Sequence, residues 1–294
     1  MAGQTATGDI GKNGKEGRNM SQEQHRKAEA FAALHAGPEA FVIPNPWDIG
    51  TTKILTGMGF KALATTSAGY AFSRGHVDGV VGRDEMLAHA AEIVAATPLP
   101  VSADLENGYD DSPEGVKTTI HLAAGIGLVG ASIEDFTGDR NAPIYEIGLA
   151  VERIEAAVAA AREQDFPFAL TARAENFIRG RPDLDDTLKR LIAFEAAGAD
   201  VLYAPGLPDL AAIRTVCQAV SKPVNVVMGL VGSDMTTAQL AEAGVRRISL
   251  GGVLARTALG AFMDAAREIQ AGHYSFIDNA ASFADISAHM RARD

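Results

Sequence analysis

Three acidic residues of this sequence stand where short apolar runs end, a position from which they could act together. Asp104 and Glu106 come at the end of the run 99–105, and Glu134 closes the run 129–134. Residues two apart on a strand face the same side, so Asp104 and Glu106 are expected to point together. Three carboxylates cannot share a water-poor pocket without a cation or a bound proton. Carboxylate oxygens with room for water suit Mg²⁺ or Mn²⁺, which makes these acids candidate metal ligands.

Arg173, near the end of another apolar run, offers a second interpretation of the same acids. Barrel-end carboxylates also form salt bridges with arginine and nearby bases, and such structural networks perturb carboxylates as catalytic sites do. Position along the chain favours neither the metal site nor the ion pairs. Both require that the ends of separate apolar runs meet in space.

Eight short apolar runs alternate with longer helical patterns along the chain. The expected strands are 41–47, 61–67, 99–105, 129–134, 168–174, 200–205, 223–228 and 246–251. The expected helices are at about 50–58, 83–96, 113–125, 148–163, 185–197, 208–219, 235–243 and 253–271. The strands recur at roughly 29-residue intervals, the length of one βα unit. Eight such units predict an α/β fold, a (β/α)8 barrel of the TIM type.

A doubly wound sheet is the competing fold. It usually has a glycine-rich nucleotide-binding turn after its first strand. The turn at 45–50 (NPWDIG) has no G-x-G-x-x-G pattern. The barrel is therefore favoured, and chemistry in a barrel takes place at the carboxyl ends of the strands.

The chain is expected to form one barrel domain, 21–294, behind a disordered tail, 1–20. The tail contains almost no large apolar side chain, and an S-x-x-Q capping pattern predicts a helix from Ser21 to about His35. The amphipathic pattern of 278–292 predicts a C-terminal helical extension.

Composition excludes several classes of protein. The 26 basic and 37 acidic residues give a formal net charge of −11, and the pI is near 5.1. This acidic balance argues against nucleic-acid binding and a basic membrane patch. No stretch approaches the roughly 20 apolar residues of a membrane span. The first 20 residues lack the apolar centre of a secretory signal. A single cysteine excludes an internal disulfide framework. We therefore expect a cytoplasmic protein.

The segment 102–109 (SADLENGY) resembles the acid-x-acid-x-Gly-Tyr segment of the isocitrate lyase/phosphoenolpyruvate mutase superfamily. Three further segments agree with that superfamily in order: 66–70 (TSAGY), 132–135 (SIED) and 171–175 (TARAE). The resemblance spans about residues 39–275. It implies a barrel enzyme that makes an enolate from an α-keto or α-hydroxy carboxylate with the help of Mg²⁺ or Mn²⁺.

The resemblance also implies a role for each matching residue. Asp104 would be the carboxylate nearest to the metal, with Glu106 and Glu134 holding its waters. Arg173 would contact the oxygen that becomes the enolate, and Asp48 would complete the water network or touch the substrate. Glu106 departs from the aspartate that is commoner at its place. The implied substrate-binding positions are Trp47, Ser67, Ala68, Gly69, Tyr70, Arg173 and Asn225.

The loop 136–146 (FTGDRNAPIYE) lacks groups that branches of the superfamily use. It has no cysteine, lysine or histidine. Cleavage assisted by a loop cysteine is therefore not indicated, and neither is the lysine-containing pattern of the mutases and phosphonopyruvate hydrolases. The lone cysteine, Cys217, lies in a helical pattern and is interpreted as a small buried apolar residue. Gly138 and Pro143 flank a polar stretch that suits a lid.

The expected reaction is C–C bond cleavage by a lyase or decarboxylase, on an oxaloacetate-like or substituted-malate-like acid. The alternatives are C–P bond or phosphoryl chemistry on phosphonopyruvate or phosphoenolpyruvate, and a keto-acid-binding protein without turnover. The proton donor stays open among water, Tyr70, Tyr145 and His76. The resemblance further implies a homo-oligomer, a dimer or a tetramer, in which C-terminal helices exchange between subunits.

Overall fold

The computed structural model describes residues 10–230 and 234–291, with side chains from residue 22 onward. Eight parallel strands form one sheet in the order β1-β8-β7-β6-β5-β4-β3-β2, which confirms the predicted barrel. The strands are β1 (Phe41–Ile43), β2 (Leu63–Ala64), β3 (Val101–Asp104), β4 (Gly130–Glu134), β5 (Ala169–Arg173), β6 (Val201–Tyr203), β7 (Val224–Val227) and β8 (Arg247–Ser249). Each of them lies inside one of the predicted runs.

The barrel is nearly closed between its first two strands. The amide of Ala64 donates to the carbonyl oxygen of Pro44 at 3.1 Å, and the Asn45 amide donates to the carbonyl oxygen of Thr65 at 2.8 Å. The oxygen of the same Asn45 side chain accepts from the amides of Leu250 and Gly251. One buried asparagine thus joins the ends of β1, β2 and β8.

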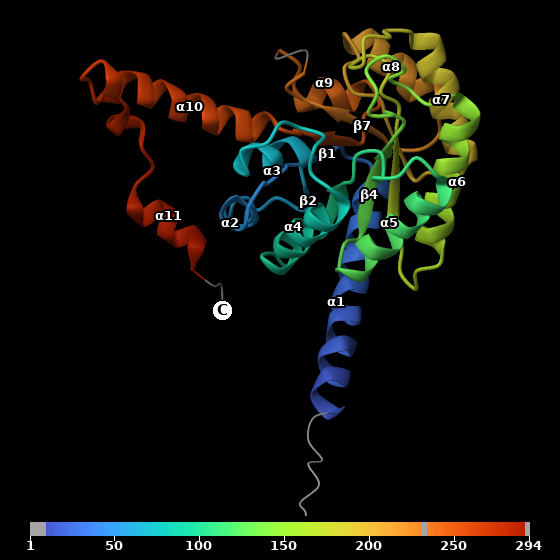
Figure 1. Cartoon of the computed structure of the whole chain (residues 1–294), viewed down its shortest axis with the longest axis horizontal. Coiled ribbons are helices and arrows are strands. Elements are labelled where there is room, and N and C mark those ends of the chain that lie inside the picture. Colours follow the sequence, from blue (N-terminus) through green and yellow to red (C-terminus); the bar gives the residue numbers. More distant parts are fainter. Residues whose placement is uncertain (1–9, 231–233, 292–294) are drawn as a thin grey trace, which may run out of the picture.

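Helices follow the strands and cover the outside of the barrel (Figure 1). They are α1 (Ile10–Ala36), α2 (Ile49–Gly57), α3 (Ser67–Ser73), α4 (Arg83–Ala95), α5 (Pro113–Gly125), α6 (Ile147–Arg162), α7 (Leu184–Ala196), α8 (Leu210–Ala219), α9 (Thr237–Glu242), α10 (Val253–Gln270) and α11 (Phe283–Met290), with a 3-10 turn η1 (Ser275–Asn279). The sequence patterns missed α3. The expected strand 61–67 stops at Ala64, because the Thr66 hydroxyl accepts from the amide of Gly69 at 3.2 Å and caps a helix instead.

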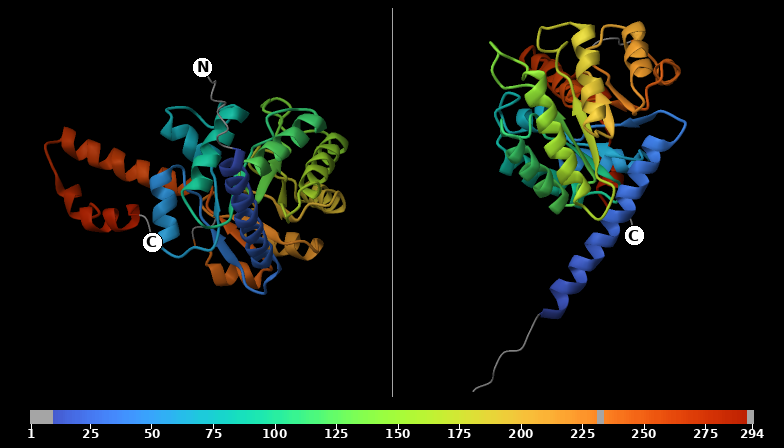
Figure 2. Two further views of the ribbon diagram at one scale, coloured as in Figure 1. Left: turned by 90° about the horizontal axis from the view of Figure 1, so that it is seen from below. Right: turned by 90° about the vertical axis from the view of Figure 1, so that its right-hand side faces the viewer.

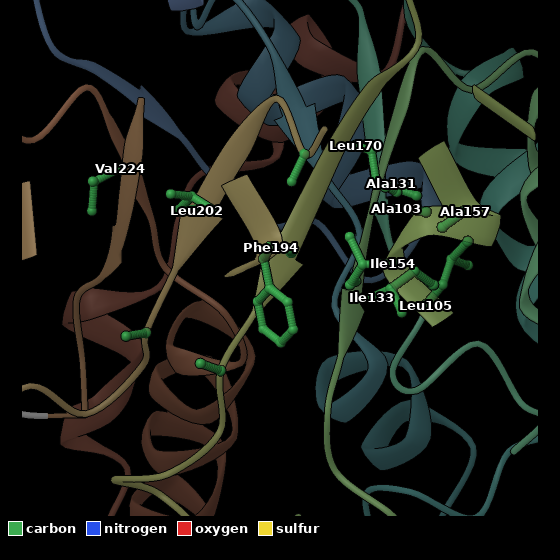
Figure 3. Close-up of a cluster of buried hydrophobic side chains, with 14 of the residues drawn as sticks. Ala103, Leu105, Ala131, Ile133, Ile154, Ala157, Leu170, Phe194, Leu202 and Val224 are labelled. Atoms are coloured by element: carbon green, nitrogen blue, oxygen red, sulfur yellow. The ribbon is translucent and has the colours of Figure 1, made fainter. Parts of the chain in front are cut away.

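Alternation along the strands separates the core from the barrel interior. On β4, Ile133 is buried beside Ile154 of α6 (Figure 3), in a core cluster that also contains Ile120 of α5. Ser132 and Glu134 instead line the cavity inside the barrel. Burying one such aliphatic side chain contributes about 1.5–3 kcal/mol. Successive side chains of a strand point to opposite faces of the sheet. Ile133 therefore packs against the helices, and Glu134 points into the barrel.

Helix α1 closes the barrel at the end opposite the carboxyl ends of the strands. Phe31 and Ala28 are fully buried with Ile43, Val129 and Ala169. The helix begins at Ile10 rather than at the predicted Ser21, so residues 10–20, expected as part of a disordered tail, have helical backbone that projects from the barrel (Figure 2). The pattern 10–20 contains no proline that would end a helix. Residues 1–9 of the expected tail lie outside the described residues.

The C-terminal segment forms an arm that stands away from the barrel (Figure 1). Helix α10 runs outward, η1 turns the chain, and α11 returns beside α2, where Lys53 Nζ donates to the carbonyl oxygen of Met290. The extension predicted at 278–292 is thus a helix at Phe283–Met290. Phe262 and Phe283 on the arm are 70% and 95% exposed. No helix among the described residues is long and apolar enough to cross a membrane.

Candidate active site

A cavity of about 290 Å³ opens at the carboxyl ends of the strands. Its acidic wall contains Asp78, Asp104, Glu106 and Glu134, and Arg173 stands among these acids. The strand ends predicted to meet do meet, because parallel strands bring all their carboxyl ends to one edge of the barrel. The candidate ligands from β3 and β4 and the arginine from β5 therefore share one cavity.

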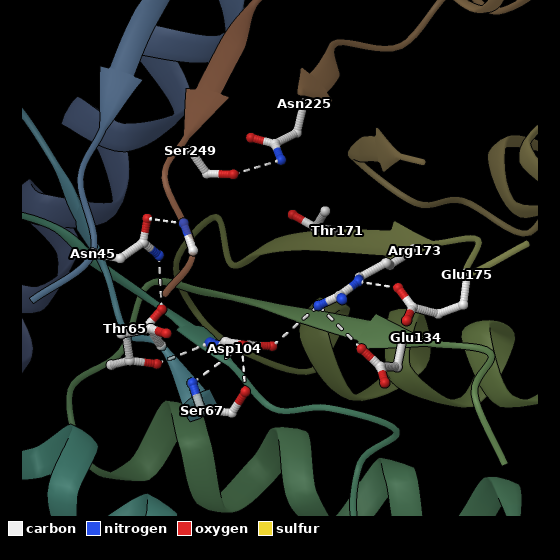
Figure 4. A network of polar contacts seen from close by, with 12 residues as sticks. Asn45, Thr65, Ser67, Asp104, Glu134, Thr171, Arg173, Glu175, Asn225 and Ser249 are labelled. Carbon is white, nitrogen blue, oxygen red and sulfur yellow. Dashed lines mark hydrogen bonds and ion pairs between the residues drawn. The ribbon is translucent and has the colours of Figure 1, made fainter. Parts of the chain in front are cut away.

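Asp104 is the last residue of β3 and is held from two sides (Figure 4). Its Oδ2 accepts from the hydroxyl of Ser67 at 2.9 Å and from the Ser67 amide at 3.2 Å. Its Oδ1 is buried without a hydrogen-bond partner and lies 3.5 Å from Arg173 Nη1. One oxygen of this carboxylate is thus fixed, and the other remains available to a ligand.

Glu106 reaches the cavity from a turn and not from a strand. Strand β3 ends at Asp104, and Glu106 has φ +48°, followed by Tyr109 at +61°. Asp104 and Glu106 both line the cavity, as predicted. The predicted reason is wrong, because Glu106 does not belong to the strand that ends at Asp104. Glu106 Oε1 is buried without a hydrogen-bond partner. Burial, together with Asp104 and Asp78, raises the pKa of Glu106 to about 8.

Asp78, which the sequence analysis did not single out, completes the acidic wall. It lies in the connection between α3 and α4, just before Gly79, which has φ +82° and lines the same cavity. Burial and the neighbouring Asp104 raise the pKa of Asp78, while a hydrogen bond from Ser67 opposes the shift. A lone aspartate beside a glycine in a long connection was the only signal in the sequence. Without the fold, that signal is indistinguishable from an ordinary turn.

Two arginines and two glutamates form a closed ring of ion pairs. Arg173 Nη1 lies 3.0 Å from Glu134 Oε2, and Arg179 Nη2 lies 3.2 Å from Glu134 Oε1. Arg179 Nε lies 2.9 Å from Glu175 Oε2, and Arg173 Nε pairs with Glu175 Oε1. Glu175 is completely buried. The ion-pair interpretation of the acids is thus correct for Glu134, whose two oxygens each face a guanidinium.

A second buried pair supports this ring from below. The Asp135 carboxylate accepts from the amide of Glu175 at 2.8 Å and lies 3.1 Å from Arg190 Nη1. Burial raises the pKa of Asp135 to about 6, and the hydrogen bond and Arg190 oppose that shift. Burial likewise raises the pKa of Glu134, which the charge of Arg173 opposes. The buried Asp135–Arg190 pair therefore contacts the ring through Glu175 and helps to hold the ring residues in one geometry.

Asp48 and Tyr70 do not line the cavity. Asp48 is exposed and caps α2, accepting from the amide of Thr51 at 2.7 Å. The Tyr70 hydroxyl donates to Glu85 at 3.1 Å, and its ring stacks on His89 with centroids 3.9 Å apart. The Asp48 carboxylate after strand β1 thus caps a helix, and the additional acid of the cavity is Asp78 from the connection between α3 and α4.

The segment that opens α3 is brought to the cavity only in part. Ser67 and Ala68 line it, and Gly69 and Trp47 do not. The amide of Gly69 is used by the Thr66 cap, and a Cβ at Gly69 would lie 2.6 Å from Thr66 Cγ2. The glycine is therefore required for packing, and the Ala68 amide is the one left for a ligand.

Asn225 lines the cavity as predicted, and it does so beside a buried cation that the sequence analysis missed. Arg247 donates through Nε to Asn225 Oδ1 at 2.9 Å and through Nη2 to Thr171 Oγ1 at 3.0 Å. Burial lowers the pKa of Arg247 to about 10. Arg247 also carries a buried Nη1 without a hydrogen-bond partner. The cavity floor is thus polar, and among the described residues no carboxylate forms an ion pair with this guanidinium.

The candidate proton donors lie away from the cavity. Tyr145 is hydrogen-bonded to Asp111 at 2.5 Å and covered by Arg153, and His76 is exposed; neither lines the cavity. In the loop 136–146 only Phe136 does so. Cys217 is half-buried in α8, outside the cavity lining, and burial raises the pKa of its thiol to about 11.

The donor set fits a hard divalent cation. In the described part of the chain no three Asp, Glu, His or Cys side chains already form a cluster that would hold a metal ion. Asp104 Oδ1 and Glu106 Oε1 are nevertheless buried without hydrogen-bond partners, and unpaired buried oxygens are costly. A cation that prefers carboxylate oxygen and water would satisfy both.

This fold and this site define a class of protein: a (β/α)8 barrel with an acidic cluster and an arginine at the carboxyl ends of strands three to five. Comparison with known families agrees, since the family model of phosphoenolpyruvate phosphomutase matches residues 31–270. The chain belongs to that family, within the phosphoenolpyruvate mutase/isocitrate lyase superfamily.

Three relatives illustrate its range. A crystal structure from Burkholderia cenocepacia, provisionally named a lyase/mutase, is 56% identical with a TM-score of 0.91, and the match covers 93% of this chain and 98% of that chain. An uncharacterized protein of Mycobacterium tuberculosis is 30% identical over 264 residues, 89% of this chain and 96% of the relative. An oxaloacetate decarboxylase of Ectopseudomonas mendocina is 25% identical over 251 residues, 83% of this chain and 84% of the relative.

Proposed function

We propose that this protein is a Mg²⁺-dependent enzyme that cleaves a C–C bond beside an α-keto or α-hydroxy carboxylate, by way of an enolate. The substrate is an oxaloacetate-like or substituted-malate-like acid. The observation that carries the proposal is that two buried oxygens, Asp104 Oδ1 and Glu106 Oε1, have no hydrogen-bond partner and lie in the same cavity as Arg173. The kinship with an oxaloacetate decarboxylase supports the substrate class.

Asp104 and Glu106 would hold the metal ion, with Glu134 and Asp78 holding its waters. When bound, Mg²⁺, for which Mn²⁺ can substitute, supplies Lewis acidity to the substrate oxygens. The four carboxylates carry more negative charge than Arg173 and Arg179 together balance, so a divalent cation lowers the repulsion among them.

The chain's own residues orient the substrate and meet the charge that develops on it. The amide of Ala68, at the start of α3, is placed to bind the substrate carboxylate, next to Ser67, whose hydroxyl and amide hold Asp104. Arg173 is fixed through Nη1 and Nε by Glu134 and Glu175, and its Nη2 has no hydrogen-bond partner among the described residues. A guanidinium held in place before the reaction stabilises an enolate oxygen without reorganising.

Tyr203 and Asn225 complete the wall opposite the acids. The Tyr203 ring lies 5.1 Å from the Arg173 guanidinium, and Asn225 donates to Ser249 Oγ at 3.0 Å. Both line the cavity and both are buried. They restrict the space beside the reacting carbons and keep water away from the enolate.

The proposal is tested by binding and turnover together. Wild-type protein is titrated with oxalate in the presence and absence of Mg²⁺, and assayed with oxaloacetate, dimethylmalate and phosphonopyruvate. We expect metal-dependent oxalate binding and turnover of one of the two C–C substrates. Asp104→Asn is expected to abolish that binding, and Asp84→Asn, an exposed acid on α4, is the matched control. Unchanged oxalate binding by Asp104→Asn would refute the metal assignment.

The same assays separate the other readings. Turnover of phosphonopyruvate alone would replace C–C cleavage by C–P chemistry. Metal-dependent oxalate binding without any product would leave a keto-acid-binding protein.

The assembly belongs to the proposal as well. We propose a cytoplasmic homo-oligomer, a dimer or tetramer, in which the arm of α10 and α11 exchanges between subunits. The exposed Phe262 and Phe283 support it, because apolar side chains of this size on a projecting arm require a partner surface. Light scattering is expected to show an oligomer that Phe262→Asp dissociates. A monomeric wild-type protein would exclude the exchange.

A further inference from the structure

Arg179 has a distinctive setting that the reaction proposed above does not use. It lies in the connection after β5 and is anchored along one edge, because Nε pairs with Glu175 at 2.9 Å and Nη2 with Glu134 at 3.2 Å. One face of its guanidinium is covered by the Phe136 ring, with the carbon of the guanidinium 3.5 Å from the ring centroid. Two charge pairs and one stacking contact leave this side chain little freedom.

One donor of Arg179 remains unused. Nη1 has no hydrogen-bond partner among the described residues, while the side chain is 29% exposed and lines the cavity. An arginine used only to orient Glu134 and Glu175 would be equally served by full burial. A guanidinium with one edge anchored and another donor left open is arranged to receive a ligand.

The surroundings of Arg179 say what that ligand is. The cavity lining next to Arg179 is apolar, because Ile178 precedes it in the chain and the Phe136 ring is stacked on its guanidinium. A guanidinium that is anchored against an aromatic ring and has one donor open to the cavity recognises one compact anionic group. The other arginines of the lining are Arg173, which the acids hold, and Arg247 and Arg256, which come from β8 and α10. The acids and the Ala68 amide serve the carboxylate and carbonyl end of the substrate, so this anion belongs to its other end.

We propose that Arg179 binds the second anionic group of the substrate, the carboxylate or phosphonate on the carbon next to the carbonyl. The inference rests on the function proposed above and names the residue that recognises the second charge of its dianionic substrates. Keto acids with an uncharged end are disfavoured, because they offer the Nη1 donor no charged partner. Arg173 and Arg179 then divide the work: the first meets the developing enolate, and the second holds the group beyond the bond that breaks.

A positioning role through Glu134 is the alternative that the experiment must separate. Oxalate fills the carboxylate and carbonyl positions and has no further group, whereas 3,3-difluorooxaloacetate carries the additional carboxylate. A positioning residue affects the binding of both, because both depend on the acidic wall. A ligand-binding Arg179 affects mainly the longer molecule.

The test is calorimetric titration of the full chain with each ligand in Mg²⁺. Arg179→Met is expected to weaken difluorooxaloacetate binding by about tenfold or more, the loss for one charge-assisted hydrogen bond, and to leave oxalate binding within about threefold. Arg179→Lys, which keeps the charge, is expected to fall between wild type and Arg179→Met for the longer ligand. Arg181→Met, an exposed arginine of the same connection outside the cavity lining, is the matched control.

Each outcome decides the matter. Equal loss for both ligands would show a positioning role only, and unchanged binding of both would show no role; either result overturns the inference. Should Arg179→Met unfold, Arg179→Lys tests the same selectivity. Failure of the wild-type protein to bind oxalate would instead refute the proposed function. Titration with phosphonopyruvate against difluorooxaloacetate then shows whether the second anion is a phosphonate or a carboxylate.

Discussion

The guanidinium of Arg153 donates a hydrogen bond to the carbonyl oxygen of Asn107, the residue that follows Glu106. Arg153 comes from α6 and is 1% exposed, and its Nη1 also donates to the carbonyl oxygen of Asp110 at 2.5 Å. The turn between these carbonyls contains Tyr109 at φ +61°, just after Glu106 at +48°. Non-glycine residues occupy this region at a cost, so a strained turn persists only when its surroundings hold it.

We expect Arg153→Met to loosen this turn. It leaves two carbonyl groups unpaired in a buried place, which should lower the free energy of unfolding by about 2–4 kcal/mol. Because Glu106 moves with the turn, Mg²⁺ affinity should fall as well, and Arg153→Lys should recover part of both. Urea unfolding and Mg²⁺ titration of the folded variant measure the two effects. A loss of stability with unchanged Mg²⁺ affinity would show that the turn does not position Glu106.

The pKa of Glu106 predicts how metal-free protein responds to pH. Its rise from 4.5 to about 8 means that the folded protein keeps a proton which the unfolded chain releases at lower pH. The stability of the metal-free protein should therefore fall as pH rises from about 5 to 8. Mg²⁺ affinity should increase over the same range, because the ligand must lose that proton. Thermal unfolding and Mg²⁺ titration against pH measure the two slopes.

Glu106→Gln is the variant that assigns these slopes. It should flatten both of them, whereas Glu114→Gln, an exposed glutamate at the start of α5, should flatten neither. Slopes that persist in Glu106→Gln would assign the titration to another acid of the cavity.

Asp48 offers a direct contrast between an expectation from resemblance and a position in the fold. Because it caps α2 outside the cavity lining, Asp48→Asn, which keeps a capping side chain, should change turnover by no more than a few-fold. Asp78→Asn should reduce turnover strongly. Steady-state kinetics of the two variants test which aspartate takes part in the reaction. A severe loss of turnover in Asp48→Asn would show that Asp48 acts on the substrate after all.

Cys217 should be dispensable for the chemistry. Its half-buried thiol in α8 has a raised pKa and does not line the cavity, so little thiolate is present at neutral pH. Cys217→Ser should retain turnover within a few-fold and lose a modest amount of stability. Activity that disappears while the circular dichroism stays native would contradict this.

The strand and helix order was readable from the sequence because it depends on local patterns. Apolar runs of strand length, helical periodicity and glycines that end helices need only near neighbours. The eight strands accordingly fall within the predicted runs. Helix α3 could not be read from the sequence. Whether residues 65–67 continue strand β2 or begin a helix depends on the hydrogen bond by which Thr66 caps α3.

The site residues likewise divide into those that sequence motifs identify and those that only the packing of the chain brings to the cavity. Motifs in the sequence identified Asp104, Glu106, Glu134 and Arg173, all of which line one cavity. Asp78, Arg179 and Arg247 could not be identified, because each comes from a connection or strand whose route is set by packing between distant segments. Asp48 was misplaced for the related reason that a strand-end aspartate and a helix cap look alike in sequence.

The amino-acid sequence by itself determined the barrel, its acidic strand ends and the absence of cysteine, lysine and histidine from the loop 136–146, since these follow from residue type and period. Only the tertiary structure decided which acids share the cavity and how their charges are balanced. The ring joins Glu134, at the end of β4, to Arg173, Glu175 and Arg179 in the segment 173–179. Its closure depends on the register of β4 and β5, which places Glu134 opposite Arg173 and which no spacing along the sequence encodes.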